Sequence, residues 1–595
     1  DERFLIKHGN YTVTGAPVVL AGVEDAVKRA AVLLIIAALL VMGLTLLFVF
    51  PAELRLLPLV IAMMATAILF GGLALTGGGL GVGAIAVIPV LIGLAVDYAI
   101  QFQYRVEHER QRASAAEPDA DNATSATDGA VDAGAIAQDN AVLAGARGAA
   151  PSVFTAAFAT LAALLALLLS SVPLVRGFGL MLAAGVAIAL LLVLTTGFAA
   201  LGWAGGSPIT RKPRQPARGV ARKLHLFAAI EKLASRGTRA FTILLVLAIG
   251  GWVLAAFGPV KTDLRDLASG NVQAVKDIEK LQKVAGTSGE VAVLVRAKDV
   301  TDKKVLDWMA KYQRQVLADA GYKGERPQCV KAQLCPALSL TDLLGGKALN
   351  QAAINELLRT VPDYAKALIS EDRTLGNMAF GIRLQSLSDQ RKLIENMRSR
   401  LNPPDGVTAE VVGLSALAAD ASGRLGAPWR RLAIPGGALL LVLLVMVAVL
   451  RSARKAAVPV LTVLIAGGLS SLLLALTRIE LNPLSATLNV FVIAIATEFT
   501  ALVYMQYLRE QERQPGTEIV AAYRNALRTT GPALFASGAT ALAGFATLAI
   551  SSIGLLRGFA VVAVVDLTAA LIGALLLLPL VTIAVEARKG VRGSK

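Results

Sequence analysis

The chain has 595 residues, of which 55% are hydrophobic and 17% are charged, and its mean hydropathy is +0.63. This excludes an ordinary soluble protein, because many near-uncharged runs reach the roughly 20 residues that a helix needs to cross a bilayer. The net charge of +16 does not indicate nucleic-acid binding, since the basic residues lie in short segments that flank apolar runs. The sequence contains no GxxxxGK[ST] phosphate loop, metal-ligand cluster or nucleophile–base arrangement, so we expect neither ATP-driven chemistry, nor a metal site, nor an enzyme.

Eleven apolar segments predict eleven membrane helices. They span roughly residues 30–50, 56–76, 82–103, 153–173, 178–203, 240–258, 432–450, 456–477, 484–506, 533–553 and 558–585. Counting through them places all the strongly basic links and the basic C-terminal tail on one side, which the positive-inside rule makes cytoplasmic. Residues 1–29 and 259–428 then lie outside the cytoplasm.

The membrane segments form an internal repeat. Residues 58–97 align without a gap on 459–498, at a shift of 401 positions. Residues 151–178 align on 532–559 at a shift of 381. The difference is accounted for by an Ala-, Asp- and Asn-rich insertion, and we expect a flexible cytoplasmic loop over 106–150.

Residues 259–428 are the only sizeable polar region, and their pattern predicts a compact α/β domain. We expect strands at 290–296, 378–384 and 408–413, and helices at 301–320, 350–369 and 388–401. Cys329 and Cys335 lie in this region. They are either two free thiols or a local disulfide, and an extracytoplasmic location favours the disulfide.

The N-terminal segment resembles the end of that same domain, because Thr14-Gly15 corresponds to Val412-Gly413. We therefore expect that a first membrane helix and most of a first α/β domain are missing from this chain. The predicted domains are the tail of the first α/β domain (1–29), a first five-helix bundle (30–205), a basic cytoplasmic linker (206–239), a membrane helix (240–258), the α/β domain (259–428), a second five-helix bundle (429–586) and a basic cytoplasmic tail (587–595).

Two carboxylic acids lie at membrane depth, at equivalent positions of the repeat. Asp97 lies in the apolar run 84–102, and Glu498 lies in 484–505. An ionisable side chain costs roughly 3 kcal/mol or more there, so it usually marks an ion or substrate pathway. A duplicated bundle with one acid per copy is typical of an ion-coupled transporter. A structural hydrogen-bonding pair that fixes helix register is the alternative.

Other polar residues lie near these acids in the sequence. Gln101, Thr497 and Thr500 are candidates to hydrogen-bond the changing charge, together with Tyr98. Asp566 is a further acid inside the last apolar segment. It is either an auxiliary relay group or a structural acid, and the sequence leaves both readings open.

The order of elements over nearly the whole chain resembles the resistance-nodulation-division (RND) superfamily. The closest resemblance is to its hydrophobe/amphiphile exporter branch, near the mycobacterial large membrane proteins and the hopanoid transporters. The run Gly93–Ile100 carries the resemblance in the fourth helix of the family plan, and Ala496–Thr500 carries it in the tenth.

The resemblance implies a proton relay between these two helices. Asp97 and Tyr98 match an Asp-Tyr pair that some lipid exporters of the family use, and Glu498 keeps the carboxyl group of the second helix. Phe499 lacks a hydroxyl, so no tyrosine role transfers there. The tenth helix also lacks the lysine partner of multidrug-efflux members, which argues against that layout.

The fold class implied is a polytopic α-helical membrane protein with two pseudo-repeats and an extracytoplasmic α/β (porter-like) domain. We expect a transporter of the bacterial inner membrane that uses the proton-motive force to export lipids or other hydrophobic or amphiphilic molecules. We expect no cofactor, with protons as the coupling ion. A homodimer or homotrimer is an open expectation. The alternatives are a sterol-sensing-like regulatory membrane protein and a protein-translocation accessory, which share the fold.

Overall fold

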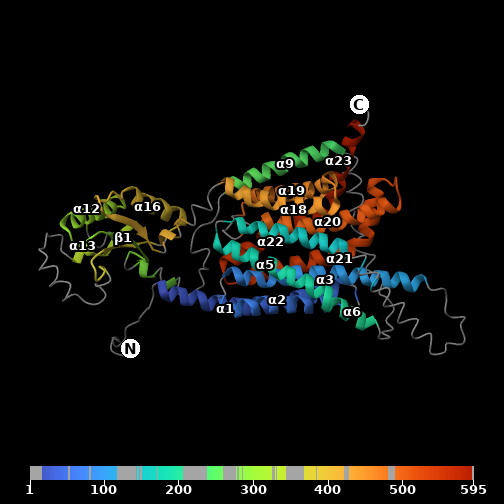
Figure 1. Ribbon diagram of the computed structural model, residues 1–595, viewed down its shortest axis with the longest axis horizontal. Coiled ribbons are helices and arrows are strands. Elements are labelled where there is room, and N and C mark those ends of the chain that lie inside the picture. Colours follow the sequence, from blue (N-terminus) through green and yellow to red (C-terminus); the bar gives the residue numbers. More distant parts are fainter. Residues whose placement is uncertain are drawn as a thin grey trace. The chain divides into compact units, whose positions relative to one another are not determined.

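The computed structural model shows a bundle of long helices and a small sheet domain (Figure 1). It describes residues 16–50, 54–78, 82–116, 150–170, 172–205, 237–258, 286–324, 331–343, 368–383, 385–413, 428–479 and 489–592, with isolated residues and short stretches at 52, 143, 147, 276–277, 280–283, 329, 415–417, 419–420 and 485. The chain divides into two compact units, one that contains the sheet and one that contains the membrane helices.

Within the described residues, eleven helices are long and apolar enough to cross a membrane, which confirms the predicted number. The helices of the membrane unit are α1 (Ala16–Val49), α2 (Leu57–Leu75), α3 (Val82–Ala116), the span Ala150–Leu169, α5 (Pro173–Leu192), α6 (Phe198–Gly205), α9 (Gly237–Phe257), α18 (Pro428–Leu450), α19 (Ala453–Leu476), α20 (Asn489–Arg513), α21 (Ile519–Thr547), α22 (Gly554–Ile572) and α23 (Leu578–Arg592). Of these, α5 and α6 belong to one span, Pro173–Trp203, and α22 and α23 belong to another, Gly554–Glu586. Helices satisfy every backbone polar group internally, so they suit hydrocarbon surroundings.

The repeat extends to the irregular turns of these helices. The 3₁₀ segment η3 (Ala166–Leu169) falls on η7 (Leu548–Ile550) at the 381 shift. The π-helical segment η4 (Val193–Gly197) falls within one residue of the π-helical η8 (Gly573–Leu577). Single π-turns inside helices are rare, so their presence at matching positions supports the duplication independently of sequence identity.

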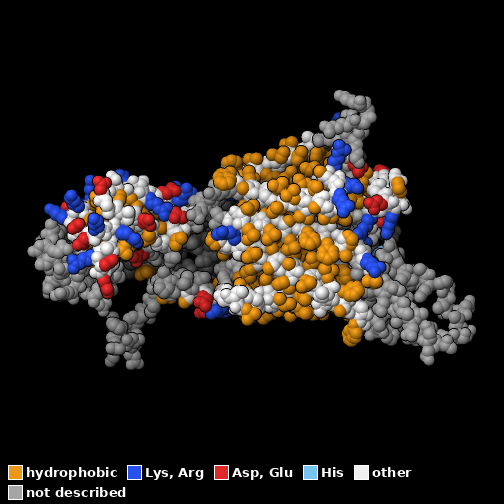
Figure 2. Space-filling view, viewed as in Figure 1, with side chains coloured by type: hydrophobic (Ala, Val, Ile, Leu, Met, Phe, Trp, Pro, Cys, Tyr) orange, Lys and Arg blue, Asp and Glu red, His pale blue; other side chains and the backbone are white. Residues whose placement is uncertain are grey.

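Burial separates central from peripheral helices. The most apolar window of Gly83–His108 is 100% buried and that of Val490–Arg513 is 89% buried, whereas those of Glu24–Val49 and Arg431–Leu450 are only 22% buried. The peripheral helices present the broad apolar surface in Figure 2, which fits contact with lipid. The central helices α3 and α20 carry the two acids.

Helices α9 and α19 approach each other closely because glycine lies on both sides of their contact. A Cβ atom added at Gly251 would lie 1.8 Å from the carbonyl oxygen of Gly468. The Trp252 indole donates a hydrogen bond to the Leu464 carbonyl oxygen at 2.9 Å. Small residues commonly allow this kind of backbone approach in membranes.

The α/β unit has a four-stranded sheet in the order β2-β3-β1-β4, with antiparallel pairing throughout. Its strands and helices are β1 (Gly289–Arg296), α12 (Lys303–Asp319), β2 (Leu334–Ser339), α13 (Leu340–Leu343), β3 (Leu375–Ile382), α16 (Leu387–Ser399) and β4 (Thr408–Val412). Strand β1 alternates, so that Val291, Val293 and Val295 face a core shared with Met309 and Phe380.

The three predicted strands, and the helices predicted at 301–320 and 388–401, are present with small shifts at their ends. The helix predicted at 350–369 lies almost wholly outside the described residues, and Ile369 instead forms an isolated bridge with Gly376. Strand β2 was not predicted. It contains Pro336, which cannot donate to a ladder, and it is tolerated because β2 is an edge strand with an irregular register beside that residue.

Two predicted boundaries differ from the structure. Helix α1 begins at Ala16, so part of the segment 1–29 that we assigned to an α/β domain is continuous with a membrane helix. Helix α3 continues to Ala116, into the stretch 106–150 that we expected to be a flexible loop. In α1 the proline Pro17 lies in the first turn, and in α3 no proline follows Pro89. Polar side chains alone do not end a helix.

Candidate functional site: an intramembrane acid pair

Asp97, Tyr98 and Glu498 come together in the interior of the membrane unit. Asp97 and Tyr98 lie on α3 and Glu498 lies on α20, and their side chains are at most 1% exposed. The surrounding sequence is apolar on every face, which predicts a helix buried on all sides. The two central helices therefore carry their carboxyl groups into the interior rather than toward lipid.

The acids are direct neighbours. The Tyr98 hydroxyl donates a hydrogen bond to Glu498 Oε2 at 3.4 Å, and the carboxyl groups of Asp97 and Glu498 are within hydrogen-bonding reach of each other. Two carboxyl groups can share a hydrogen bond only if one of them carries a proton. No Lys or Arg forms an ion pair with either acid in the described part of the chain.

Each acid also accepts a hydrogen bond from a hydroxyl on the opposite half of the bundle. Ser537 on α21 donates to Asp97 Oδ1, and Thr160 on the span Ala150–Leu169 donates to Glu498 Oε2 at 3.4 Å. We did not predict either residue. Their repeat equivalents are alanines, so the duplication gave no signal for them.

Of the other predicted residues, Gln101 contacts an acid, whereas the hydroxyl groups of Thr497 and Thr500 donate elsewhere. Gln101 donates to Asp97 Oδ1 at 2.6 Å, as expected for a residue one turn along α3. Thr497 and Thr500 instead donate to the carbonyl oxygens of Ile493 at 2.5 Å and Ala496 at 2.7 Å. A threonine inside a helix readily bonds the carbonyl one turn back, and this directs both hydroxyl hydrogens away from the acids.

Asp566 has a different partner. It is 2% exposed, and its Oδ1 accepts a hydrogen bond from Ser470. Its Oδ2 has no hydrogen-bond partner among the described residues. Asp566 thus links α22 to α19, and its hydrogen bond does not involve the acid pair.

Residues that are equivalent in the two repeats touch each other at three places. Besides Asp97 and Glu498, Arg105 donates to Gln506 Oε1 at 3.3 Å. The rings of Phe178 and Phe559 are 5.7 Å apart, in an edge-on contact. Contacts between equivalent residues lie on the axis that relates two copies, so the acid pair lies on the pseudo-twofold axis of the bundle.

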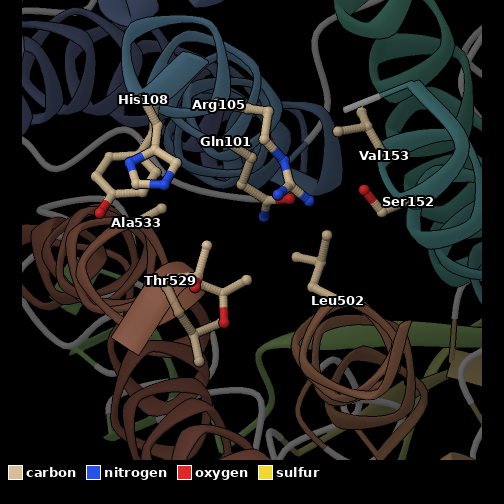
Figure 3. Close-up of a pocket in the computed structure, with 11 residues that line it drawn as sticks. Gln101, Arg105, His108, Ser152, Val153, Leu502, Thr529 and Ala533 are labelled. Atoms are coloured by element: carbon tan, nitrogen blue, oxygen red, sulfur yellow. The ribbon is translucent and has the colours of Figure 1, made fainter. Parts of the chain in front are cut away.

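A small pocket lies beside the pair, and Figure 3 shows it. It has a volume of about 40 Å³. Its lining comes from α3, α20, α21 and the start of the span Ala150–Leu169, and consists of Gln101, Tyr104, Arg105, His108, Ser152, Val153, Leu502, Thr529, Thr530, Ala533 and Leu534. Gln101 is the residue that both lines this pocket and contacts Asp97.

In the α/β unit, Cys329 and Cys335 form a disulfide with their Cα atoms 5.7 Å apart. A search of the described residues finds no group of three or more His, Cys, Asp or Glu side chains that could hold a metal ion.

Comparisons with known proteins agree with this architecture. The model of the MMPL family matches residues 265–593. The crystal structure of SecDF from Thermus thermophilus, a translocon-associated membrane protein, is similar with a TM-score of 0.56 and 16% sequence identity. The match covers 95% of this chain but 62% of SecDF, so this chain spans less than two thirds of that protein. No curated protein matches the chain significantly.

Proposed function

Because the chain belongs to the MMPL family, a transporter family of the RND superfamily, we propose that it is a proton-driven exporter of lipids or other hydrophobic or amphiphilic molecules. Asp97, Tyr98 and Glu498 are its proton relay. We place the protein in the bacterial inner membrane and expect it to act without enzymatic chemistry, as a homodimer or homotrimer.

The observation that carries this proposal is the contact between Asp97 and Glu498 at the pseudo-twofold axis. A carboxylate at this depth costs roughly 3 kcal/mol or more, whereas a protonated carboxyl group avoids most of that cost. Because neither acid has a basic partner among the described residues, proton loss changes the net charge of a buried site. The hydroxyls of Ser537 and Thr160, which belong to opposite halves, are positioned to respond to that change.

Proton exchange at this position provides a mechanism for motion. A proton bound by the pair allows the two halves to meet through neutral groups, and its loss leaves a carboxylate that requires donors or water. The two repeats then re-pack around the axis, as repeat-built transporters do when they alternate access. The α/β domain, outside the cytoplasm by the charge distribution, is the part that receives the exported molecule.

The test is lipid transport in proteoliposomes under an imposed proton gradient. The parent protein is compared with Asp97→Asn and Glu498→Gln, which remove the exchangeable proton with little change of shape. We expect gradient-driven flux of a fluorescent phospholipid to be lost in both variants, while thermal melting shows that both remain folded. Equal flux in the parent and both folded variants would refute the relay.

A second candidate function, a protein-translocation accessory, is favoured by the similarity to SecDF. It uses the same acid pair but a different cargo. In that case the parent would show proton flux without lipid flux, and export of secreted proteins from cells would fall in the Asp97→Asn variant.

A further inference from the structure

The pocket in Figure 3 borders the acid pair at Gln101 and has the chemistry of a water site. Its volume of about 40 Å³ holds roughly three water molecules, since one water needs about 10–15 Å³ measured in this way. Polar groups line it from three helices. They are Gln101, Tyr104, Arg105 and His108 on α3, Ser152 on the span Ala150–Leu169, and Thr529 and Thr530 on α21. A cavity that is both polar and roomy enough is one that water occupies.

The two threonine hydroxyl groups of the pocket act as acceptors. Thr529 donates its hydrogen to the Asn525 carbonyl oxygen at 3.2 Å, and Thr530 donates to the Ala526 carbonyl oxygen at 2.8 Å. Their remaining lone pairs can accept hydrogen bonds from water or from hydronium. Arg105, His108, Tyr104 and Ser152 add hydrogen-bond donors to the same lining, so the pocket offers both donors and acceptors, as a cluster of water molecules requires.

Gln101 lies between the pocket and the acid pair. Its Nε2 donates to Asp97 Oδ1 at 2.6 Å, and its Oε1 is buried with no hydrogen-bond partner among the described residues. An unsatisfied buried carbonyl oxygen is costly, and a pocket water that donates to it removes the cost. The amide is thus placed to join pocket water on one side to Asp97 on the other.

The charge distribution gives the side of the membrane that this pocket faces. Arg105 and His108 lie at the end of the span Gly83–His108, and α21 reaches the pocket directly after Arg524 and Arg528. Figure 2 shows Lys and Arg side chains gathered at one end of the membrane helices. By the positive-inside rule this end is cytoplasmic.

We propose that this pocket is a water-filled vestibule through which the acid pair exchanges protons with the cytoplasm, and that Gln101 is the residue that positions Asp97 for the transfer. The inference rests on the proposed function of the pair. When the Gln101 amide turns aside, a pocket water reaches the protonated Asp97. The carboxyl O–H bond breaks, the proton passes to that water, and the resulting hydronium leaves through the pocket. Asp97 remains as a carboxylate that accepts from Ser537, and from Gln101 once the amide has turned back.

The first test is access of a charged thiol reagent to a cysteine in the pocket. Ala533→Cys places a thiol in the lining, and the matched control Ala536→Cys places one on the same helix at a position that is 0% exposed and outside the lining. Cys329 and Cys335 form a disulfide and contribute no background. We expect a membrane-impermeant methanethiosulfonate to label Ala533→Cys from the cytoplasmic side only, and not to label Ala536→Cys. Absence of labelling, or labelling from the outer side, would overturn the vestibule.

The second test is the role of Gln101. Gln101→Met keeps the length of the side chain and removes its hydrogen bonds. We expect proton-driven flux to fall about tenfold, with a larger solvent deuterium isotope effect, while labelling of Ala533→Cys in the same background is unchanged. Flux and isotope effect equal to those of the parent would refute the role of Gln101. These failures differ from failure of the relay itself, which Asp97→Asn reports separately.

Discussion

At the residue scale, the acid pair depends on hydroxyls supplied by the opposite half of the bundle. Ser537 bonds to the acid of the first half, and Thr160 bonds to the acid of the second half. Their own repeat equivalents are Ala156 and Ala541, which lie one helical turn away from the hydroxyl of the same half. Each half thus donates one hydroxyl hydrogen bond to the acid of the other half, but from positions that are not equivalent in the repeat.

We predict that Ser537→Ala slows proton-driven flux by about tenfold or more, because a buried carboxylate loses a donor. Flux in proteoliposomes measures the effect. Ser537→Thr restores a hydroxyl and is the matched control, so it should recover most of the rate. A Ser537→Ala variant with the parent's rate would show that the hydrogen bond has no role in coupling.

The sequence was sufficient to find Asp97, Tyr98 and Glu498, because a carboxyl group inside an apolar run is rare and both repeats carry one. The sequence was not sufficient to predict that Ser537 and Thr160 contact the acids. Ser and Thr occur often in membrane helices, where many simply bond the preceding turn, as Thr497 and Thr500 do here. Only the packing of the helices separates the hydroxyls that reach an acid from those that do not.

At the element scale, the close contact of α9 with α19 requires glycine at position 251 but not at the neighbouring position 250. A Cβ at Gly251 would collide with backbone atoms of α19, whereas a Cβ at Gly250 would meet nothing within 4 Å. We predict that Gly251→Ala lowers stability by about 1–3 kcal/mol through overpacking, while Gly250→Ala has no effect. Thermal melting of both variants in detergent checks this, and equal melting temperatures would contradict the packing.

The turn before β3 contains a pH-sensitive feature. Ser370 and Thr374 donate to Asp372, and these hydrogen bonds hold the pKa of Asp372 below its ordinary value of 3.8. A folded-state pKa below the unfolded one adds stability above pH 3.8, and that stability is lost as the pH falls through the folded value.

We therefore predict that Asp372→Asn lowers the melting temperature of the α/β unit at pH 7, and that the difference from the parent disappears once the pH falls below the lowered folded-state pKa of Asp372. Fluorescence of Trp308, which packs against the core of that unit, follows the transition. A difference that is constant with pH would show that the ionised carboxyl group is not what stabilises the turn.

Helices and strands were predicted correctly where one hydrophobicity pattern distinguished them clearly. The eleven apolar segments and the alternation of β1 were unambiguous. Strand β2 escaped prediction because Pro336 argues against a strand, and only its edge position permits the proline. The N-terminal limit of α1 was predicted wrongly because the hydrophobicity pattern does not mark where a helix begins when its first turns contain polar residues.

At the scale of the whole molecule, the pseudo-twofold axis is the organising feature of the membrane unit. The contacts of Asp97 with Glu498, Arg105 with Gln506, and Phe178 with Phe559 all join equivalent residues. An acid pair on the axis is shared by both halves, so we expect a change in its charge to act on their interface rather than on one half alone.

We predict that joining the two halves stops transport. In Arg105→Cys/Gln506→Cys, a short thiol cross-linker ties the helices α3 and α20 together, and flux should fall to the level without a proton gradient. The single variant Gln506→Cys, treated with the same reagent, should retain its own untreated rate. Full transport by the cross-linked double variant would show that the halves do not move apart at this position.

The most direct test of the central claim is an infrared titration of the purified protein. Protonated carboxyl groups give a C=O stretching band that carboxylates lack. We predict that the parent shows such a band, that it responds to pH, and that Asp97→Asn and Glu498→Gln each change all of the band that comes from the pair, because two neighbouring acids that share a proton titrate together. The buried Asp566 contributes separately. A pH-dependent band that neither substitution alters would contradict the account.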